Sequence, residues 1–490
     1  MSHSREFTRK EVDSLLTAAM GKTLGDVDKN HIFDKTLTNP KVTGIAGDVV
    51  EQSILDMEPD TRPEADITVD GEPVELKTTG IRKSKKKNCD LYEGKEPMSI
   101  TGVSVKNIVH ENFENSRFWN KLDKVLLVYY EYASLKKVKA REYMDFPLMG
   151  YHFHEFSPED KAVLKADWEQ VYNYVKRIQD EKLDEKEYAG LSHDLRGSLL
   201  YIDTAPKWPN PPRFRLKRSV VTAIVQEYFS GKKEKLEVIK ELTGIEALDK
   251  TCHEKTVIYK NRTLKDIAIE FGLPIYNEEG KPNKALSEQV TVRMMGGKSK
   301  KINSIDLFNK AGIVGKTLIM SNKGGRTEDT KLFTVDFSEW LDPDVKFEES
   351  QIYDYFANNQ FLCIVFQETV EGDMLQSKFL GFKRFSFDDD FINTYAKRIW
   401  DDVRDKVFNN KLVETVCTRK DGSVIKNPVG TDKTAVNFPK SSDRQYLFMR
   451  GTSGDSTAKP LVINGIHMYQ QQVWIRGKDI IELINKKEFI

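Results

Sequence analysis

The sequence repeats itself at a spacing of about 240 residues, and this internal similarity limits the folds open to the chain. Each match is weak alone, but matches that keep their order at nearly constant spacing are hard to obtain by chance. They predict a tandem duplication of one fold. The matching segments are residues 23–27 with 263–267, 65–66 with 305–306, 74–78 with 313–317, 125–130 with 361–366, and 156–157 with 385–386, followed by Trp168 and Trp400.

The local sequence patterns predict both helices and strands. Thr8 and Glu11 form a capping box before a helical face that ends at Gly21. Residues 47–55 and 159–177 also have helical periodicity, whereas 125–130 is a continuous apolar run typical of a buried strand. The expected fold class is therefore α/β or α+β, with a mixed sheet flanked by helices in each half.

The length of 490 residues agrees with two to four domains. The charged stretch 230–240 begins with Ser-Gly and is the best candidate boundary, although an exposed helix inside one domain explains it nearly as well. Together with the repeat it predicts a first domain over 1–230, a linker over 231–245 and a second domain over 246–490.

Composition excludes several protein classes. Lys plus Arg and Asp plus Glu are both 76, so the chain is not a uniformly basic DNA-packaging protein, although local basic patches are not excluded. The four cysteines are far apart, which argues against a disulfide framework or a structural zinc site. The N-terminus is polar, and no apolar run approaches the roughly 20 residues that cross a bilayer. We therefore expect a cytoplasmic protein without a membrane partner.

The stretch 64–78, EADITVDGEPVELKT, carries the most informative pattern. Apolar and polar residues alternate on both sides of Asp70-Gly71, which is typical of a hairpin with a two-residue turn. The numbers of paired residues then add up to 141, so Asp66 lies opposite Glu75. Val74 would point to the core, and Glu75 and Lys77 would point away from it on a common face.

Two opposed carboxylates repel each other unless a cation lies between them. A hard divalent ion such as Mg²⁺ satisfies this need, with the carbonyl of Leu76 as a candidate third ligand. Lys77 would orient an attacking water or neutralise developing charge, which is the chemistry of phosphodiester hydrolysis. By itself the short motif favours an ordinary surface hairpin with a Glu-Lys pair, and Pro73 complicates a regular hairpin.

The wider run GDVVEQSIL through EADITVDGEPVELKTTG resembles the MutH-like endonucleases, a branch of the restriction-endonuclease-like nucleases. The resemblance extends over most of residues 10–225, including the basic segment FRLKRSVVTAIV. By this resemblance the active site comprises Glu51, Asp66, Glu75, Lys77 and Lys121, the last just before the strand at 125–130.

The tandem arrangement is similar to the two-domain type II restriction endonucleases that cut at GATC. That resemblance implies Mg²⁺ as cofactor, a double-stranded DNA substrate and products with 5′ phosphates. It also implies that the second half is catalytically silent and assists DNA binding. The repeat agrees, because Asp66 and Lys77 match Asp306 and Lys316, but Glu75 matches Val314.

Two other active-site positions have lost their side chains in the second copy. Glu51 is matched by Thr291, and Lys121 falls near Ala357. We therefore expect the second half to keep the fold without the chemistry.

Basic residues near the proposed site are candidate DNA contacts, because phosphate contacts supply affinity. By resemblance Lys207 matches a family lysine that touches DNA, but Ala205 stands where the family has an arginine, which puts base readout in doubt. The candidates are Arg82, Lys83, Lys85, Lys86, Lys207, Arg215 and Lys217.

The sequence thus predicts a Mg²⁺-dependent type II restriction endonuclease directed at GATC, with dimerisation on DNA left open. A mismatch-repair-type nicking endonuclease of the same fold is the first alternative, and the duplication argues against it. The second alternative is a non-catalytic DNA-binding regulator built from degenerate nuclease folds. The set Asp66, Glu75 and Lys77 argues against that one.

Overall fold

The computed structural model divides the chain into two compact units. The first comprises Met1–Ser134, Val138–Asp249 and Gly297–Ile313, and the second comprises Leu135–Lys137, Lys250–Gly296 and Val314–Ile490. The structure describes residues 5–59, 64–84, 91–134, 136–206, 209–230, 236–325, 328–419, 421–427, 430–443, 445–452 and 458–490.

The first unit is built on a six-stranded mixed sheet. Its strand order is β1-β2-β3-β6-β7, and β4 pairs with the far end of β3. β1 and β2 are parallel, as are β3 and β6, whereas β2–β3 and β6–β7 are antiparallel. The strands are β1 (Glu6–Phe7), β2 (Ile67–Val69), β3 (Glu72–Lys83), β4 (Tyr92–Gly94), β6 (Val125–Glu131) and β7 (Leu148–His154).

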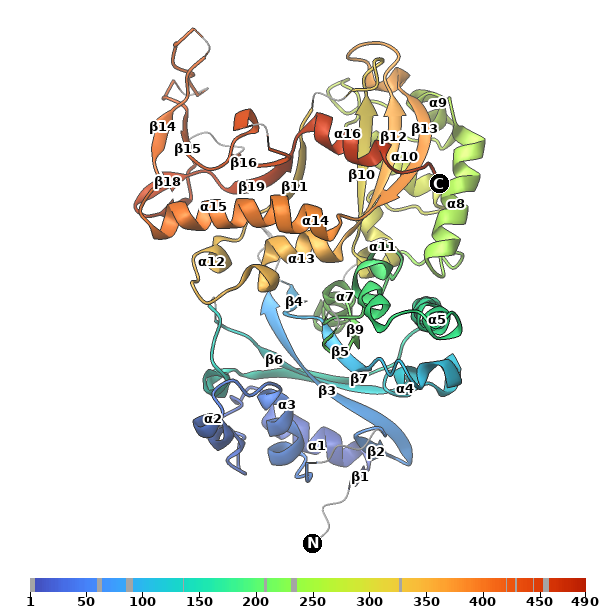
Figure 1. Cartoon of the computed structure of the whole chain (residues 1–490), viewed down its shortest axis with the longest axis vertical. Helices are drawn as coiled ribbons and strands as arrows, with labels where there is room; N and C mark the ends of the chain where they lie inside the picture. The colour runs from blue at the N-terminus through green and yellow to red at the C-terminus, as the bar shows by residue number, and fades with distance from the viewer. Residues whose placement is uncertain are drawn as a thin grey trace. The chain divides into compact units, whose positions relative to one another are not determined.

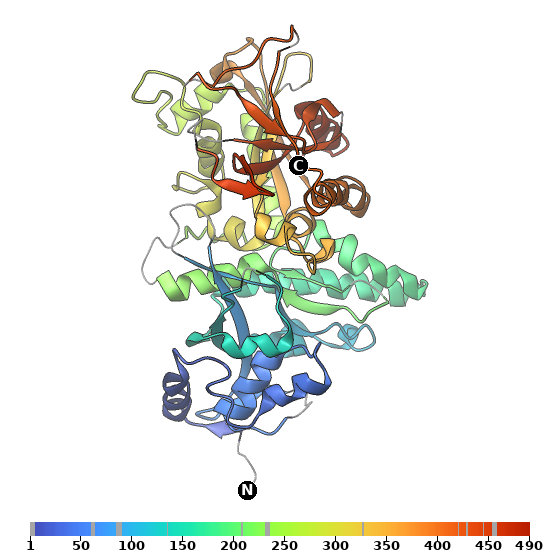
Figure 2. The same cartoon turned by 90° about the vertical axis from the view of Figure 1, so that its left-hand side faces the viewer.

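Helices cover both faces of this sheet, with α1, α2 and α3 on one face and α5 and α7 on the other (Figures 1 and 2). Val12 and Leu16 of α1, Val74 and Leu76 of β3, and Leu126 of β6 belong to the core under the first group. The helices are α1 (Arg9–Ala19), α2 (Lys35–Thr38), α3 (Ile45–Val49), α4 (Arg117–Asn120), α5 (Pro158–Asp180), α6 (Gly190–His193) and α7 (Arg218–Ser230).

The helices expected near residues 9–19, 47–55 and 159–177 and the strand expected at 125–130 are all present, within a few residues of the predicted ends. Thr8 and Glu11 form the predicted capping box, and Gly21 follows the helix with φ 77°. The mixed α/β fold class is confirmed.

A second, three-stranded sheet of the first unit has the order β5-β9-β8, and α7 follows β9 directly. Asp167 of α5 supports the approach to this sheet, because its carboxylate accepts backbone N–H groups of Leu200, Tyr201 and Ile202. The strands are β5 (Met98–Gly102), β8 (Ile202–Asp203) and β9 (Arg213–Leu216).

The second unit repeats both sheet orders. Its β10-β12-β13 corresponds to β3-β6-β7, and its β11-β19-β16 corresponds to β5-β9-β8. Even a bulge recurs, between Ser99 and Thr101 in the first unit and between Lys331 and Phe333 in the second. This repetition supports the proposed duplication. The strands are β10 (Ile313–Met320), β11 (Thr330–Thr334), β12 (Gln360–Gln367), β13 (Lys378–Phe385), β16 (Leu447–Gly451) and β19 (Gln471–Ile475).

The remaining elements of the second unit surround an aromatic-rich core that includes Trp340, Phe356 and Trp400. Its hairpins are β14 (Glu414–Val416) with β15 (Thr434–Val436), and β17 (Leu461–Ile463) with β18 (Ile466–Met468). Its helices are α8 (Ile245–Tyr259), α9 (Leu264–Glu270), α10 (Leu286–Met294), α12 (Phe337–Trp340), α13 (Gln351–Asn358), α14 (Asp389–Phe391), α15 (Lys397–Phe408) and α16 (Gly477–Asn485).

The compact units are divided differently from the predicted domain ranges. The units divide after Asp249, within α8, and the segment Gly297–Ile313, expected in the second domain, belongs to the first unit. This segment contains α11 (Asp306–Ala311), whose Lys310 forms ion pairs with Asp160 of α5 at 2.7 Å and with Asp306 at 3.0 Å. Three charged groups that pair in a largely buried position attach α11 firmly to the first unit.

No helix in the described ranges is both long enough and apolar enough to cross a bilayer.

Candidate active site

The predicted hairpin has the predicted register. Ile67 pairs with Val74 and Val69 pairs with Glu72, so paired numbers add up to 141. Asp70 and Gly71 have φ values of 49° and 86°, as a type I′ turn requires at both central positions. The paired residues end at Ile67 and Val74, and one further step of the same register would place Asp66 opposite Glu75.

The side chains of Asp66 and Glu75 are held in different ways. Asp66 accepts the backbone N–H of Leu76 at its Oδ2, with a distance of 2.9 Å. Glu75 is only 1% exposed, and its two carboxylate oxygens accept from Lys77 and, at 2.7 Å, from Lys121. The sequence placed Glu75 correctly on the face opposite Val74, but did not predict that it is buried.

Lys121 lies between the two carboxylates. It follows the last residue of α4 and precedes β6, as expected. Its Nζ is 2.7 Å from Glu75 Oε2 and 3.8 Å from Asp66 Oδ1, and it also donates to the carbonyl of Glu64 at 2.6 Å. The ammonium group therefore supplies positive charge where the carboxylates approach each other.

Glu51 lies on a π-helical turn (Val50–Ile54) that continues α3, and such turns are frequent at functional sites. Burial, and next the negative charge of Asp66, raise the pKa of Glu51 to about 7. Burial also raises the pKa of Glu75, and the charge of Lys77 opposes that shift. The structure thus brings Glu51, Asp66, Glu75, Lys77 and Lys121 together, with three carboxylates competing for two ammonium groups.

This donor set fits a hard divalent cation. In the part of the chain that the structure describes, no three His, Cys, Asp or Glu side chains form a ready-made metal cluster. Mg²⁺ does not need one, because it keeps several waters and often binds one or two carboxylates. The N–H and C=O of a strand residue point to the same edge, so the Leu76 carbonyl lies on the edge where its N–H meets Asp66.

Replacing Glu51 by Gln should reduce the loss of stability at rising pH. The folded state keeps a proton on Glu51 up to about pH 7, whereas the unfolded state releases it near pH 4.5. The native protein therefore loses stability as pH rises through this window, by about 1–3 kcal/mol for this group. Urea unfolding at pH 5 and pH 8 in EDTA measures the difference.

The control for this prediction is Glu155→Gln, which removes an exposed carboxyl. Equal pH dependence in Glu51→Gln and the native protein would show that Glu51 is not buried as described.

Two comparisons bear on this arrangement. Residues 55–167 match the family "DNA mismatch repair enzyme MutH", and this range includes Asp66, Glu75, Lys77 and Lys121. The first unit contains a MutH-type domain. The chain is also 26% identical over 439 residues to "Type II restriction enzyme Sau3AI" of Staphylococcus aureus, covering 82% of this chain and 85% of that protein. That similarity spans both units, whereas the MutH match lies in the first unit except for residues 135–137.

Four of the seven predicted DNA contacts lie among the described residues, and contact with DNA stays a prediction for three of them, Arg82, Lys83 and Arg215. Arg82 and the exposed Lys83 end β3, paired with Glu93 and Tyr92 of β4. Arg215 of β9 forms a two-pronged ion pair with Asp203 of β8, at 2.7 and 3.0 Å. Lys85, Lys86 and Lys207 lie outside the described residues.

The position of Lys217 contradicts its predicted contact with DNA. It is 5% exposed, its Nζ donates to the carbonyl of Leu199 at 2.6 Å, and burial lowers its pKa. The charge of Asp167 opposes that shift. A buried ammonium group cannot reach a phosphate, so Lys217 supports the fold rather than DNA binding. The basic run in the sequence carried no sign of this burial.

The second copy differs more than the repeat predicted. Lys316 lies on β10 and donates to the carbonyl of Lys331, Val314 precedes it by two residues, and Thr291 is buried on α10. Asp306, the sequence match of Asp66, lies in the first turn of α11 rather than before a strand. In the second copy the helix α11 precedes β10, where β2 of the hairpin precedes β3 in the first copy. Asp306 is therefore not the structural counterpart of Asp66.

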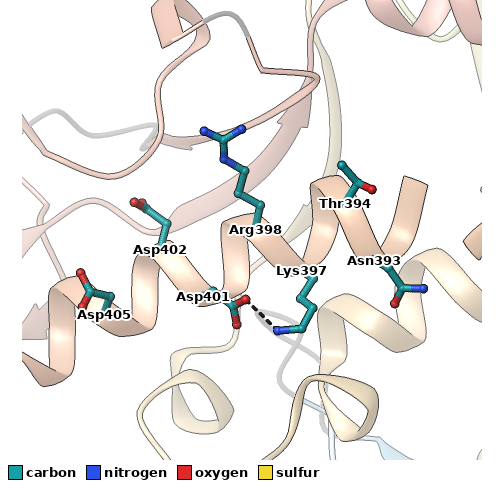
Figure 3. A pocket seen from close by; sticks show the side chains of 7 residues that line it. All are labelled: Asn393, Thr394, Lys397, Arg398, Asp401, Asp402 and Asp405. Carbon is teal, nitrogen blue, oxygen red and sulfur yellow. Dashed lines mark hydrogen bonds and ion pairs between the residues drawn. The ribbon is translucent and has the colours of Figure 1, made fainter. Parts of the chain in front are cut away.

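A shallow depression on the second unit lies along the π-helical turn before α15 and α15 itself (Figure 3). Its carboxylates are already paired, Asp401 with Lys397 at 2.7 Å and Asp402 with Lys406 at 2.6 Å. These charged residues lie on the outer face of α15, whose other face packs into the core, and they do not resemble the carboxylate set of the MutH-type domain.

Proposed function

We propose that this protein is a type II restriction endonuclease that cleaves double-stranded DNA at a specific site with Mg²⁺. The observation that carries the proposal is the meeting of Asp66, Glu75 and Lys77 on one hairpin of a MutH-type domain. Similarity to a type II restriction enzyme over 82% of the chain supports the restriction activity. The site is directed at GATC, and the products carry 5′ phosphates.

Asp66, Glu75 and the carbonyl of Leu76 would hold the ion. When bound, the ion supplies Lewis-acid stabilisation of the charge that develops on the phosphate oxygens. Lys77, held by Glu75, is 21% exposed at its side chain and orients the attacking water. Water adds to phosphorus and gives up a proton, the bond from phosphorus to the 3′ oxygen breaks, and the 3′ oxygen takes up a proton from solvent to leave as a hydroxyl.

Lys121 and Glu51 adjust the charge of this centre. Lys121 forms an ion pair with Glu75 at 2.7 Å, which favours the ionised carboxylate and opposes the rise in the pKa of Glu75 that burial causes. Glu51, with a pKa of about 7, exchanges a proton with solvent near neutral pH, so it can accept one released by the attacking water.

The second unit assists DNA binding and has no cleavage activity. Val314 cannot ligate a metal, and Thr291 donates its hydroxyl to the carbonyl of Ser287 within its own helix. The cell holds the enzyme in its cytoplasm, and dimerisation on DNA would provide a second active centre for the opposite strand.

Digestion of a defined plasmid, followed by mapping of the DNA ends, tests the proposal. We expect Mg²⁺-dependent double-strand breaks at GATC with 5′ phosphates. Nicks alone would instead favour the mismatch-repair-type enzyme, since the matched family is named for mismatch repair. DNA binding without cleavage would favour a regulator and contradict the proposal.

A further inference from the structure

The N-terminal strand reaches the active site from a distant part of the sequence. β1 pairs in parallel with β2, with Glu6 opposite Thr68 and Phe7 opposite Val69. The backbone N–H of Thr68 donates to the carbonyl of Arg5 at 2.9 Å. This register places Arg5 beside the segment that leads into Asp66.

The guanidinium group of Arg5 binds two backbone carbonyls on that segment. Its Nη1 donates to the carbonyl of Asp66 at 2.8 Å, and its Nη2 donates to the carbonyl of Glu58 at 2.5 Å. These carbonyls stand on either side of residues 59–65, of which 60–63 lie outside the described ranges. A guanidinium presents its N–H groups in one rigid plane, so it fixes both carbonyls in one geometry.

Asp66 is consequently held at two points. Arg5 binds its main-chain carbonyl, and the N–H of Leu76 binds its carboxylate at 2.9 Å. Rotation of the main chain at Asp66 would break the first bond and turn the carboxylate away from Glu75. The hairpin alone supplies only the second.

We propose that Arg5 is a positioning residue of the metal centre, which holds the main chain of Asp66 so that its carboxylate faces Glu75. The inference rests on the proposed function and deepens it. Arg5 lies 50 residues before the start of the matched MutH region at residue 55, so the family match does not include it. The positive charge of Arg5 also opposes the rise in the pKa of Glu51, which agrees with its position near the carboxylates.

The test is Mg²⁺ binding to the full-length protein without DNA, measured by isothermal titration calorimetry. Arg5→Met keeps the apolar stem and removes both hydrogen bonds. We expect it to weaken Mg²⁺ binding about 10-fold, the lower end of the effect of losing a residue that orients a metal ligand. In cleavage assays the Mg²⁺ concentration for half-maximal rate should rise equally, while saturating Mg²⁺ restores most of the rate.

Two further variants separate positioning from general stability. Arg5→Lys keeps the charge but not the planar fork, so its Mg²⁺ affinity should lie between those of the native protein and Arg5→Met. Arg9→Met is the matched control, because Arg9 pairs with Asp13 and stacks over Phe153, and its side chain has no such bond to Asp66. It should bind Mg²⁺ as the native protein does.

The outcomes are distinguishable from failure of the proposed function. If the native protein binds Mg²⁺ and Glu75→Gln abolishes this binding, but Arg5→Met and Arg5→Lys bind normally, the role of Arg5 is refuted and the nuclease proposal stands. If the native protein binds no Mg²⁺, both proposals fail. Should Arg5→Met not fold, the intermediate affinity expected for Arg5→Lys still decides the matter.

Discussion

Replacing Lys77 by Ala is expected to lower the single-turnover rate of DNA cleavage by about 100- to 1000-fold. Lys77 and Lys121 both bond to Glu75, but the Lys77 side chain is the more exposed, at 21% against 12%, so Lys77 can reach both a water and a phosphate. Because Lys77 would be one of many groups that contact DNA, its loss should change the Kd for DNA by no more than about three-fold. Rapid-quench cleavage and a binding titration in EDTA measure the two effects.

The matched control is Lys316→Ala, which removes the corresponding lysine of the second unit. Lys316 donates to the carbonyl of Lys331 and has Val314 rather than a carboxylate two residues before it. We expect its cleavage rate to remain within about two-fold of the native rate. A Lys77→Ala protein that cuts as fast as the Lys316→Ala protein would remove Lys77 from the mechanism.

Replacing Lys310 by Ala should destabilise the first unit by about 3–5 kcal/mol, since it leaves buried carboxylates without their counter-charge. The side chains of Lys310, Asp160 and Asp306 are only 12%, 8% and 15% exposed, and the hydroxyl of Tyr201 also donates to Asp160 at 3.0 Å. Urea unfolding followed by circular dichroism should show that the first unit unfolds at a lower urea concentration than in the native protein.

Lys281→Ala is the control for this second prediction. Lys281 and Glu279 pair at 2.9 Å with side chains 73% and 68% exposed, so their loss should cost no more than about 0.5 kcal/mol. Equal stability of the Lys310→Ala and Lys281→Ala proteins would contradict the role of the α11 ion pairs. The same ion pairs predict that a fragment of residues 1–249 is unstable, because it lacks α11.

The parts of the fold that depend on neighbouring residues could be predicted from the sequence. Asp70-Gly71 favours a type I′ turn, and that turn alone determines which residues of the two strands face each other. Alternation then assigns Val74 to the core and Glu75 to the opposite face. The capping box at Thr8 predicts the start of α1 for the same reason.

The errors concern contacts between residues far apart in the chain. Nothing near Lys217 in the sequence reveals that it is buried beside Leu199, and nothing near Lys310 reveals its ion pair with Asp160, which lies 150 residues earlier. The binding of Asp66 by Arg5 spans 61 residues and depends on β1 joining the sheet. Such contacts are set by tertiary packing, which periodicity and propensity do not report.

The proposed function requires that Asp66 and Glu75 bind a divalent metal ion. Anomalous diffraction from crystals soaked in Mn²⁺, which shares the oxygen preference of Mg²⁺, tests it directly. We expect a Mn²⁺ peak in contact with both carboxylates and the Leu76 carbonyl, and we expect its loss in Glu75→Gln crystals. A well-ordered hairpin with no peak there, or a peak that persists in Glu75→Gln, would contradict it.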